Sequence, residues 1–452
     1  MNIVELLRQW FNDSTAINLS TIYAEYGLSY HHYLTEIIRY WNKLQFIVKK
    51  TLRSLSKDRN AEKLNLETCI YITYRFFWEE AQFQDIVNEI NTNLNVPEKK
   101  ILFKFYERLS TFKWDIALQN KTLVDKLSIR CAIPSFTINT LLPVLDYSSI
   151  KQNIVAMDTR SRKGIIYIRI NNLVVPTKSL SELQIEIAKY FSGIGVKTEP
   201  EDTFPNMLQA SVMDKRRIVK SEYYQNNSII FQDKASFSSI LLLDPQPNDL
   251  ICDLCAAPGI KTSLIAQQSE GKATVIAGDF HHERLQKMIN FLTKCRVTNV
   301  NISQWDGIHP PLVAESFDRI LLDAPCTGSG TFTSNPELKW RQTKNFLDRN
   351  VILQEKLLKS ASALLKPGGT LVYSTCSLYP EEGEYQIQKI MNEQLEFKKG
   401  PSWLPPSYII NNSSIRGTGR FFPAKHNTIG FFVAKIVKRK GNNFENNEVQ
   451  NI

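Results

Sequence analysis

Apolar residues in the first quarter of the chain recur every three to four positions, which is the spacing of one face of a helix. Bulky apolar side chains dominate residues 33–51 and 66–90, and the pattern resumes over residues 98–109. The alternation typical of strands does not appear in this part of the sequence. We therefore predict an all-α domain over residues 1–115.

The pattern changes in the next part of the chain. Residues 116–146 are typical of a helical linker. A strand pattern over residues 164–170, a helical pattern over 179–190 and a second short strand over 195–198 then follow one another. This mixture predicts a small α+β domain over residues 147–235.

Beyond residue 235, short apolar strands alternate with helical segments. Strands are expected at residues 250–254, 273–277, 317–322 and 370–373, and helices at 261–268, 283–294 and 353–365. Such alternation favours a doubly wound, mostly parallel sheet that binds its ligand at the carboxyl ends of the strands. The fold class is therefore α/β, with a Rossmann-like domain over residues 236–440, and the Asn- and Glu-rich residues 441–452 are expected to form a frayed tail.

The excess of basic residues indicates which class of molecule the protein binds. Lys and Arg number 55 against 45 Asp and Glu, giving a formal net charge of +10, and the isoelectric point is near 9.1. A polyanion such as nucleic acid is the favoured partner, with a solvated basic face as the alternative. The candidates for a track that binds phosphates are Arg160, Arg162, Lys163, Arg169, Lys215, Arg216 and Arg217.

Seven cysteines scattered along 452 residues do not fit a disulfide framework. The first 20 residues lack the features of a secretory or organelle signal, and no apolar run is long enough to span a membrane. We expect a reduced, cytoplasmic and monomeric protein. A zinc or redox role for Cys252 and Cys255 is disfavoured because no second cysteine pair supplies further ligands, so no metal is expected.

A small-residue turn, CAAPGIKT over residues 255–262, follows the first strand of the α/β region. It lacks both phosphate-binding glycine patterns, so a ligand with a short amino-acid portion fits better. Asp279 ends the next strand, where a carboxylate accepts hydrogen bonds from ribose hydroxyls. Asp306 follows a third strand, where it could accept from an adenine amino group. Each Asp alone more often caps a turn, but their order after successive strands favours an adenosine site.

Two cysteines directly follow apolar strands, Cys326 in the sequence DAPC and Cys376 in the sequence STC. Carbon 5 of cytosine is too weak a nucleophile to take a methyl group directly, so a thiolate must first add to carbon 6. Asp323 is the candidate that stabilises this adduct at ring nitrogen 3. A second thiol could help to remove the carbon 5 proton. The residues alone leave open which thiol attacks, and a buried, inert cysteine is the alternative for either one.

At these residues the chain resembles the NOP/Sun family of RNA cytosine-5 methyltransferases, over roughly residues 164–435. The motifs that carry the resemblance are FQDKAS (231–236), CAAPGIKT (255–262), DAPCTGSG (323–330), NPELKWR (335–341), YSTCSL (373–378), RFFPAKH (420–426) and GFF (430–432). The helical first domain is similar to a NusB-like RNA-binding unit, and the middle domain resembles a ferredoxin-like or RRM-like domain. The family fold implies a class I methyltransferase domain after these two.

The resemblance implies S-adenosylmethionine as cofactor, Cys376 as nucleophile and Cys326 as the residue that assists product release. The residues that it implies for cofactor binding are Cys255, Ala256, Ala257, Pro258, Gly259, Ile260, Lys261, Asp279, Arg284, Asp306 and Asp323. Ile260 departs from the family pattern, which usually has a second glycine there. A side chain at that position could crowd the cofactor turn.

The sequence therefore predicts an RNA (cytosine-5)-methyltransferase, with ribosomal RNA as the first choice of substrate and transfer RNA as the second. A non-catalytic RNA-binding factor in ribosome assembly is the alternative from another class, and the two intact cysteines argue against it. A DNA cytosine methyltransferase is disfavoured, because those enzymes use the Pro-Cys thiol and do not need the Thr-Cys one.

Overall fold

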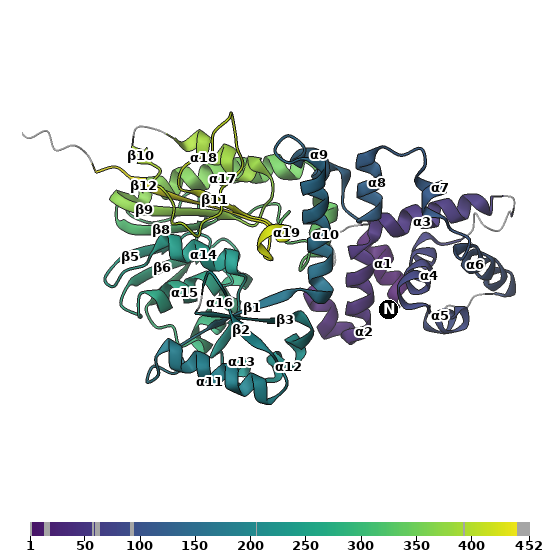
Figure 1. Cartoon of the computed structure of the whole chain (residues 1–452), viewed down its shortest axis with the longest axis horizontal. Helices are drawn as coiled ribbons and strands as arrows, with labels where there is room; N and C mark the ends of the chain where they lie inside the picture. The colour runs from purple at the N-terminus through teal and green to yellow at the C-terminus, as the bar shows by residue number, and fades with distance from the viewer. Residues whose placement is uncertain are drawn as a thin grey trace, which may run out of the picture. The chain divides into compact units, whose positions relative to one another are not determined.

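The computed structural model describes residues 2–12, 19–56, 58, 64–90, 95–204, 206–391 and 394–440 (Figure 1). The predicted tail over residues 441–452 lies outside them. The chain divides into two compact units, of which unit 1 comprises Met1–Val155 and Phe332–Lys344, and unit 2 comprises Ala156–Thr331 and Asn345–Ile452. In the described part of the chain, no helix has the length and apolar character needed to cross a membrane.

Unit 1 is helical, as predicted. Its helices are α1 (Ile3–Asn12), α2 (Leu19–Arg39), α3 (Trp41–Ser54), α4 (Leu66–Glu79), α5 (Phe83–Ile90), α6 (Val96–Leu109), α7 (Trp114–Leu118), α8 (Leu123–Arg130) and α9 (Ser135–Leu141). The apolar faces of α1 to α6 bury one core. The two long helical segments predicted at residues 33–51 and 66–90 are each divided, at Tyr40, which has a non-helical backbone, and at Glu80, which has a left-handed backbone with φ 51°.

The second segment of unit 1, Phe332–Lys344, packs on this helical core. Trp340 contacts the core, and its Nε1–H donates to the Ile38 carbonyl at 2.6 Å. The Lys339 ammonium donates to the Arg39 carbonyl at 3.2 Å. The NPELKWR motif is therefore held by the helical unit, although its position in the sequence lies within the predicted methyltransferase domain.

The boundary between the units falls within α10 (Tyr147–Lys163), and unit 2 continues with an antiparallel sheet of order β2-β3-β1-β4. Its elements are β1 (Ile165–Ile170), α11 (Leu180–Gly193), β2 (Thr198–Pro200), β3 (Met207–Ser211), α12 (Lys215–Lys220), α13 (Glu222–Gln225) and β4 (Ile229–Phe231). The predicted first strand and helix are confirmed. The second predicted strand begins only at Thr198, because Gly195, with φ 73°, turns the chain after the helix.

Arg169 in β1 is buried instead of facing a phosphate backbone. Its side chain is 1% exposed, and its guanidinium donates to the Gln267 side chain at 3.0 Å and to the Ser263 hydroxyl at 2.6 Å. The prediction that Arg169 belongs to an electrostatic track is therefore wrong, because this charge fixes the small sheet against α15 (Ile260–Gln268). The run over residues 215–217 is exposed, whereas the side chains of residues 160–163 lie outside the described ones.

The second sheet has the order β10-β12-β9-β8-β5-β6-β7, with β11 paired to β12. Its strands are β5 (Leu250–Asp253), β6 (Thr274–Asp279), β7 (Val300–Gln304), β8 (Phe317–Asp323), β9 (Leu365–Thr375), β10 (Leu395–Glu396), β11 (Thr418–Phe421) and β12 (Phe431–Lys438). The strands from β7 to β9 are parallel, as predicted. The sequence did not indicate the antiparallel strands that extend the sheet beyond β9.

Helices cover both faces of this sheet (Figure 1). On one face α14 (Lys234–Leu243), α15 and α16 (His282–Lys294) bury one core, and on the other α17 (Lys344–Leu364) and α18 (Glu384–Ile390) bury a second. The strand order reverses at β5, which pairs with β6 on one side and β8 on the other. In such sheets ligands bind outside the carboxyl ends of the strands at the point of reversal. The candidate site is built there.

Candidate active site

The structure brings the two cysteines together at the carboxyl ends of neighbouring parallel strands. Cys326 lies in the loop after β8, and Cys376 directly follows β9. Their Sγ atoms are 3.2 Å apart, which is within hydrogen-bond distance. Both side chains are partly exposed. Two thiols in contact and accessible from solvent can serve covalent chemistry together, as buried structural cysteines cannot.

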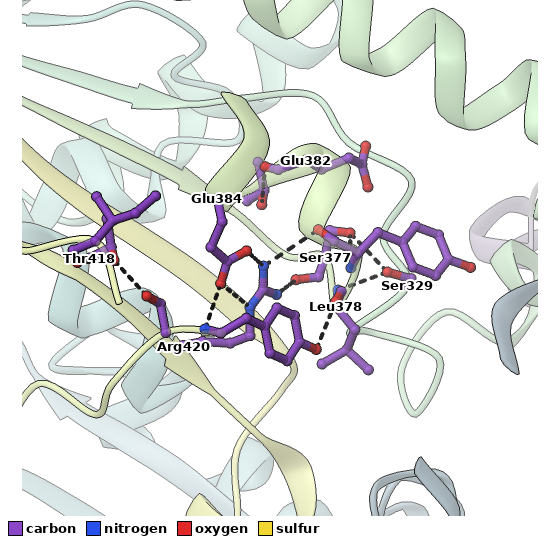
Figure 2. Close-up of polar contacts among 12 residues, drawn as sticks. Ser329, Ser377, Leu378, Glu382, Glu384, Thr418 and Arg420 are labelled. Carbon is purple, nitrogen blue, oxygen red and sulfur yellow. Dashed lines mark hydrogen bonds and ion pairs between the residues drawn. The ribbon is translucent and has the colours of Figure 1, made fainter. Parts of the chain in front are cut away.

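The two loops that carry these thiols are tied to each other by short polar contacts. The backbone N–H of Gly330 donates to the Cys376 carbonyl at 3.0 Å. The Ser329 hydroxyl lies 2.9 Å from the Ser377 hydroxyl and accepts from the Leu378 N–H at 2.8 Å (Figure 2). A shift of either loop would therefore break contacts of the other.

Glu382 fixes the residues on both sides of Cys326. Its carboxylate is fully buried and accepts from the Thr327 N–H at 2.9 Å, the Thr327 hydroxyl at 2.5 Å and the Gln354 amide at 3.0 Å. Gln354 also donates to the Pro325 carbonyl at 2.8 Å. Burial raises the pKa of Glu382. One side chain therefore positions the loop of the first cysteine.

A buried ion pair positions the loop that follows Cys376. The guanidinium of Arg420 and the carboxylate of Glu384 are both 0% exposed and form two contacts, of 2.6 and 3.0 Å (Figure 2). Arg420 also donates to the Ser377 carbonyl at 2.6 Å, and it lies over the Tyr408 ring at 4.3 Å. Such a bidentate pair fixes both direction and distance. We call Cys326, Cys376, Glu382, Glu384 and Arg420 the thiol edge.

The surroundings of Cys326 favour the protonated form of its thiol. The hydrogen bond with Cys376, burial and the nearby charge of Glu382 all raise the pKa of the Cys326 thiol well above its usual range. A thiol with a raised pKa keeps its proton at neutral pH. Cys326 is therefore a thiol at neutral pH, and either sulfur can be the donor in the contact between the two.

The predicted cofactor turn connects β5 to α15. Gly259 begins the helix with φ 96°, and a Cβ added there would lie 2.8 Å from Met288. Glycine is therefore required at this position. Lys261, in the first turn of α15, forms an ion pair with Asp323 at the end of β8. This pair links the cofactor turn to the thiol edge.

A cavity of about 250 Å³, here called the cofactor cavity, opens at this turn. The predicted cofactor residues that line it are Cys255, Ala256, Ala257, Pro258, Ile260, Lys261 and Asp323. The FQDKAS motif adds Phe231, Gln232, Asp233 and Ser236, and β5 adds Asp253. Ile260 lines the wall of the cavity, so its side chain shapes the site that the usual glycine would leave wider.

The predicted nucleoside residues lie beside the turn. Asp279, which ends β6, is 4% exposed, accepts from the Ala257 N–H at 3.2 Å and pairs with Arg284 at 3.2 Å. Asp306 follows β7, is exposed and accepts from the Ile308 N–H at 2.9 Å. Asp279 thus joins the turn directly, whereas Asp306 stands at the next strand end.

Two buried side chains of the cofactor cavity have polar atoms with no hydrogen-bond partner among the described residues. They are Oδ1 of Asp253 and both amide atoms of Gln232. Burial raises the pKa of Asp253 to about 7. Buried polar atoms need partners, and the methionine portion of S-adenosylmethionine carries the ammonium and carboxylate that would supply them. The residues present therefore fit this cofactor.

Sequence reasoning missed three of these side chains. Asp253 ends a strand two residues before the cofactor turn, and Gln232 lies in the FQDKAS motif, so each carried a local signal. Glu382 carried none, because only the tertiary fold places it beside Cys326. Groups of three or more potential metal ligands do not occur within the described residues.

Comparison with known proteins defines the class. Residues 240–437 match the family described as 16S rRNA methyltransferase RsmB/F. A tRNA (cytosine(49)-C(5))-methyltransferase of Pyrococcus abyssi is 34% identical over 228 residues, which are 48% of this chain and 72% of that relative. The chain belongs to this family, also called NOP/Sun, of S-adenosylmethionine-dependent RNA cytosine-5 methyltransferases.

Comparison with solved structures extends the likeness to 92% of the chain. A probable ribosomal RNA small subunit methyltransferase B of Synechocystis is 40% identical over 212 residues, or 46% of this chain and 47% of that relative, so the matched region spans about half of that protein. The crystal structure of PH0851 superposes with a TM-score of 0.72 at 25% identity, covering 92% of this chain and 91% of that one. A methyltransferase homolog of Pyrococcus horikoshii has a TM-score of 0.59 at 27% identity, covering 70% of this chain and 98% of that one.

Proposed function

We propose that this protein transfers a methyl group to carbon 5 of a cytosine in RNA, with Cys376 as the nucleophile. The observation that carries the proposal is the contact of the Cys326 and Cys376 sulfur atoms, 3.2 Å apart, at the ends of β8 and β9. The Lys261–Asp323 ion pair lies at the same sheet edge, so the cofactor turn and the thiols share one site.

The chemistry begins when the Cys376 thiolate forms a bond to carbon 6 of the ring. The electron pair of the double bond between carbons 5 and 6 then resides on carbon 5 as an enamine. Asp323 is the candidate that hydrogen-bonds ring nitrogen 3 in this adduct. S-Adenosylmethionine, when bound, supplies the electrophilic methyl group that carbon 5 takes up.

Product release requires loss of the carbon 5 proton. That electron pair re-forms the double bond, and Cys376 leaves as a thiolate. Cys326, whose sulfur lies 3.2 Å from that of Cys376, fits the role of base in this step. It must first give its own proton to solvent, and as a thiolate it then takes the carbon 5 proton.

Ribosomal RNA remains the first choice of substrate, supported by the likeness to the Synechocystis relative. Transfer RNA is the second, since the Pyrococcus abyssi relative, with 72% of its length matched, is named for that substrate. Unit 1 is assigned to RNA binding as a NusB-like domain, and the small antiparallel sheet as a ferredoxin-like or RRM-like domain. The predicted boundaries, 1–115, 116–146, 147–235 and 236–440, remain part of this proposal.

Bisulfite sequencing of total RNA from cells with and without the protein tests activity, base and substrate together. A 5-methylcytosine lost from ribosomal RNA supports the first choice, and a mark lost from transfer RNA alone would replace it by the second. Incubation of the pure protein with tritiated cofactor and RNA tests the non-catalytic alternative. RNA binding without any transfer between pH 6 and 9 would refute the enzyme. DNA as the only methylated acceptor would refute the RNA proposal.

A further inference from the structure

A groove of about 480 Å³ lies in unit 2 between the segment that leads into β4 and the exposed face of α16. Its walls include Tyr224 and Phe231 on one side and Lys287, Phe291 and Lys294 on the other. We call it the lysine groove. Its lining contains no Asp or Glu among the described residues, so the local field is positive.

The lysine groove adjoins the cofactor cavity. Phe231 and Ile260 line both, so a chain that occupies the groove would reach the wall of the cavity. The two walls of the groove are joined by the Asn171 side chain, which donates to the Asn227 carbonyl at 3.1 Å and to the Cys295 carbonyl, directly after α16, at 3.2 Å.

Aromatic and basic side chains alternate along this groove. Lys287 and Lys294 lie seven residues apart on α16, two helical turns, with the half-buried Phe291 between them. Both ammonium groups are exposed, and neither forms a salt bridge in the described part of the chain. Across the groove, the ring of Tyr224 lies 5.1 Å from that of Phe231, and the Lys215 ammonium lies 5.7 Å from the Phe231 ring.

We propose that the lysine groove binds the single-stranded RNA segment next to the target cytidine. This inference rests on the proposed function and names a site for the flanking nucleotides. Single strands are bound by grooves in which bases stack on aromatic rings while lysines neutralise phosphates. The groove offers both, and it shares Phe231 and Ile260 with the cofactor cavity, so a strand bound in it would lie next to that cavity. Ile260 then separates the two sites, which explains a side chain where the family usually has glycine.

The experiment uses the full chain and a fluorescein-labelled 12-nucleotide oligocytidine, with binding measured by anisotropy at 50 and 200 mM KCl. The variant Lys287→Ala/Lys294→Ala is expected to weaken binding about tenfold at the lower salt concentration. It should also reduce the slope of log K against log salt by about 1.4, since each phosphate contact to a single strand contributes about 0.7. The variant Phe291→Leu keeps an apolar side chain and should weaken binding about fivefold without changing the salt slope.

The matched control is Arg349→Ala/Lys356→Ala on α17, which removes two charges seven residues apart from exposed positions on the other face of the sheet. It should bind as the unmodified protein does. Binding of S-adenosylmethionine alone, measured by calorimetry, should be unchanged in the groove variants. Methyl transfer to cellular RNA by the unmodified protein tests the proposed function separately.

Equal losses in the groove variant and the α17 control would overturn the proposal, because charge alone would then explain binding. So would a salt slope that does not change in Lys287→Ala/Lys294→Ala. Competition by a 12-residue polyglutamate as strong as that by unlabelled oligocytidine would assign the groove to acidic peptides instead. If the unmodified protein binds oligocytidine through the groove but transfers no methyl group, the groove stands and the proposed function fails.

Discussion

The thiol edge and the cofactor cavity lie side by side in the site but differ in how their buried polar atoms are satisfied. At the thiol edge, both oxygens of Glu382 and both of Glu384 accept hydrogen bonds. In the cofactor cavity, Oδ1 of Asp253 and the amide of Gln232 have no partner among the described residues. The protein thus builds the thiol edge from its own side chains, whereas the cavity is completed by its ligand.

The largest effect is expected from the thiols themselves. Cys376→Ala should lower the rate of methyl transfer on the order of 10⁴-fold or more. Without the Cys376 sulfur, the thiol edge has no nucleophile to form the covalent adduct at carbon 6 of cytosine. Cys326→Ala should instead accumulate a protein–RNA adduct, since attack proceeds and release fails. Denaturing gels of protein incubated with radiolabelled RNA and cofactor distinguish the two. An adduct in Cys376→Ala but not in Cys326→Ala would mean that their roles are exchanged.

A second prediction concerns the ion pair of the thiol edge. Arg420→Met leaves the Glu384 carboxylate buried without its partner and should destabilise unit 2 by about 3–5 kcal/mol. The double variant Arg420→Met/Glu384→Leu should recover most of this loss, because no charge is then left unpaired. Thermal unfolding checks both. As a control, Lys359→Ala breaks an exposed pair with Glu355 and should change the midpoint little.

Recovered stability need not restore activity in the double variant. Arg420 also donates to the Ser377 carbonyl next to Cys376, a contact that Met cannot make. We therefore expect the double variant to fold but to transfer methyl groups at least about tenfold more slowly. Full activity would show that the ion pair only stabilises the fold and does not position the nucleophile.

A third prediction is that Asp253 in the cofactor cavity makes the stability of the cofactor-free protein depend on pH. The pKa of Asp253 is about 7 in the folded protein and about 3.9 in the unfolded chain. Between about pH 4 and pH 7, the Asp253 carboxyl group is therefore protonated in the folded protein and ionised in the unfolded chain. The contribution of Asp253 to stability is therefore fully present below about pH 4 and is lost as the pH rises through 7, by at most roughly 4 kcal/mol. Asp253→Asn should lack this loss.

Thermal midpoints of the protein and of Asp253→Asn, each measured from pH 4 to 9 without cofactor, test this prediction. The variant should gain on the unmodified protein as the pH rises and then level off above pH 8. Saturating S-adenosylmethionine should stabilise the unmodified protein more than the variant, because its ammonium would pair with the carboxylate. Parallel pH profiles for the two proteins would contradict the assignment of a proton to Asp253.

The smallest effect is expected at Glu382. Glu382→Gln keeps the shape of the side chain but removes a negative charge that raises the pKa of Cys326. The pH at which iodoacetamide alkylates Cys326 should therefore fall, as measured by mass spectrometry of the labelled peptide. Stability should fall by about 1–3 kcal/mol, because an amide cannot accept all the hydrogen bonds of Glu382. An unchanged alkylation profile would show that this charge does not act on the thiol.

The same contrast explains what the sequence could predict. Strands β5, β6, β8 and β9 and helices α15 and α16 follow from local apolar patterns and turn chemistry, and with them the positions of Cys326, Cys376 and the cofactor turn. Strand β12 could not be predicted, because a short segment with six apolar residues among eight fits a buried helix equally well until a partner strand is known. The sequence also did not predict that the helices are interrupted at Tyr40 and Glu80, because the spacing of apolar residues continues across both positions.

The polar side chains that fix the site were the hardest to foresee. Glu382, Glu384 and Arg420 look like surface residues in the sequence, and their burial depends on contacts between segments far apart in the chain. The prediction for Arg169 was wrong for the same reason, because its guanidinium donates a hydrogen bond to Gln267 inside unit 2. Periodicity indicates which face of an element is apolar, but it does not show where a buried charge finds its partner.

The attachment of residues 332–344 to the helical unit limits how the molecule can be dissected. A fragment that starts at residue 156 would retain Trp340 and Lys339 but lose the Ile38 and Arg39 carbonyls and the apolar core that these side chains contact. This stretch begins only six residues after Cys326 in the chain. Loss of turnover in such a truncated protein would therefore reflect an unsupported connection to the first thiol as much as the loss of the RNA binding that we propose for unit 1.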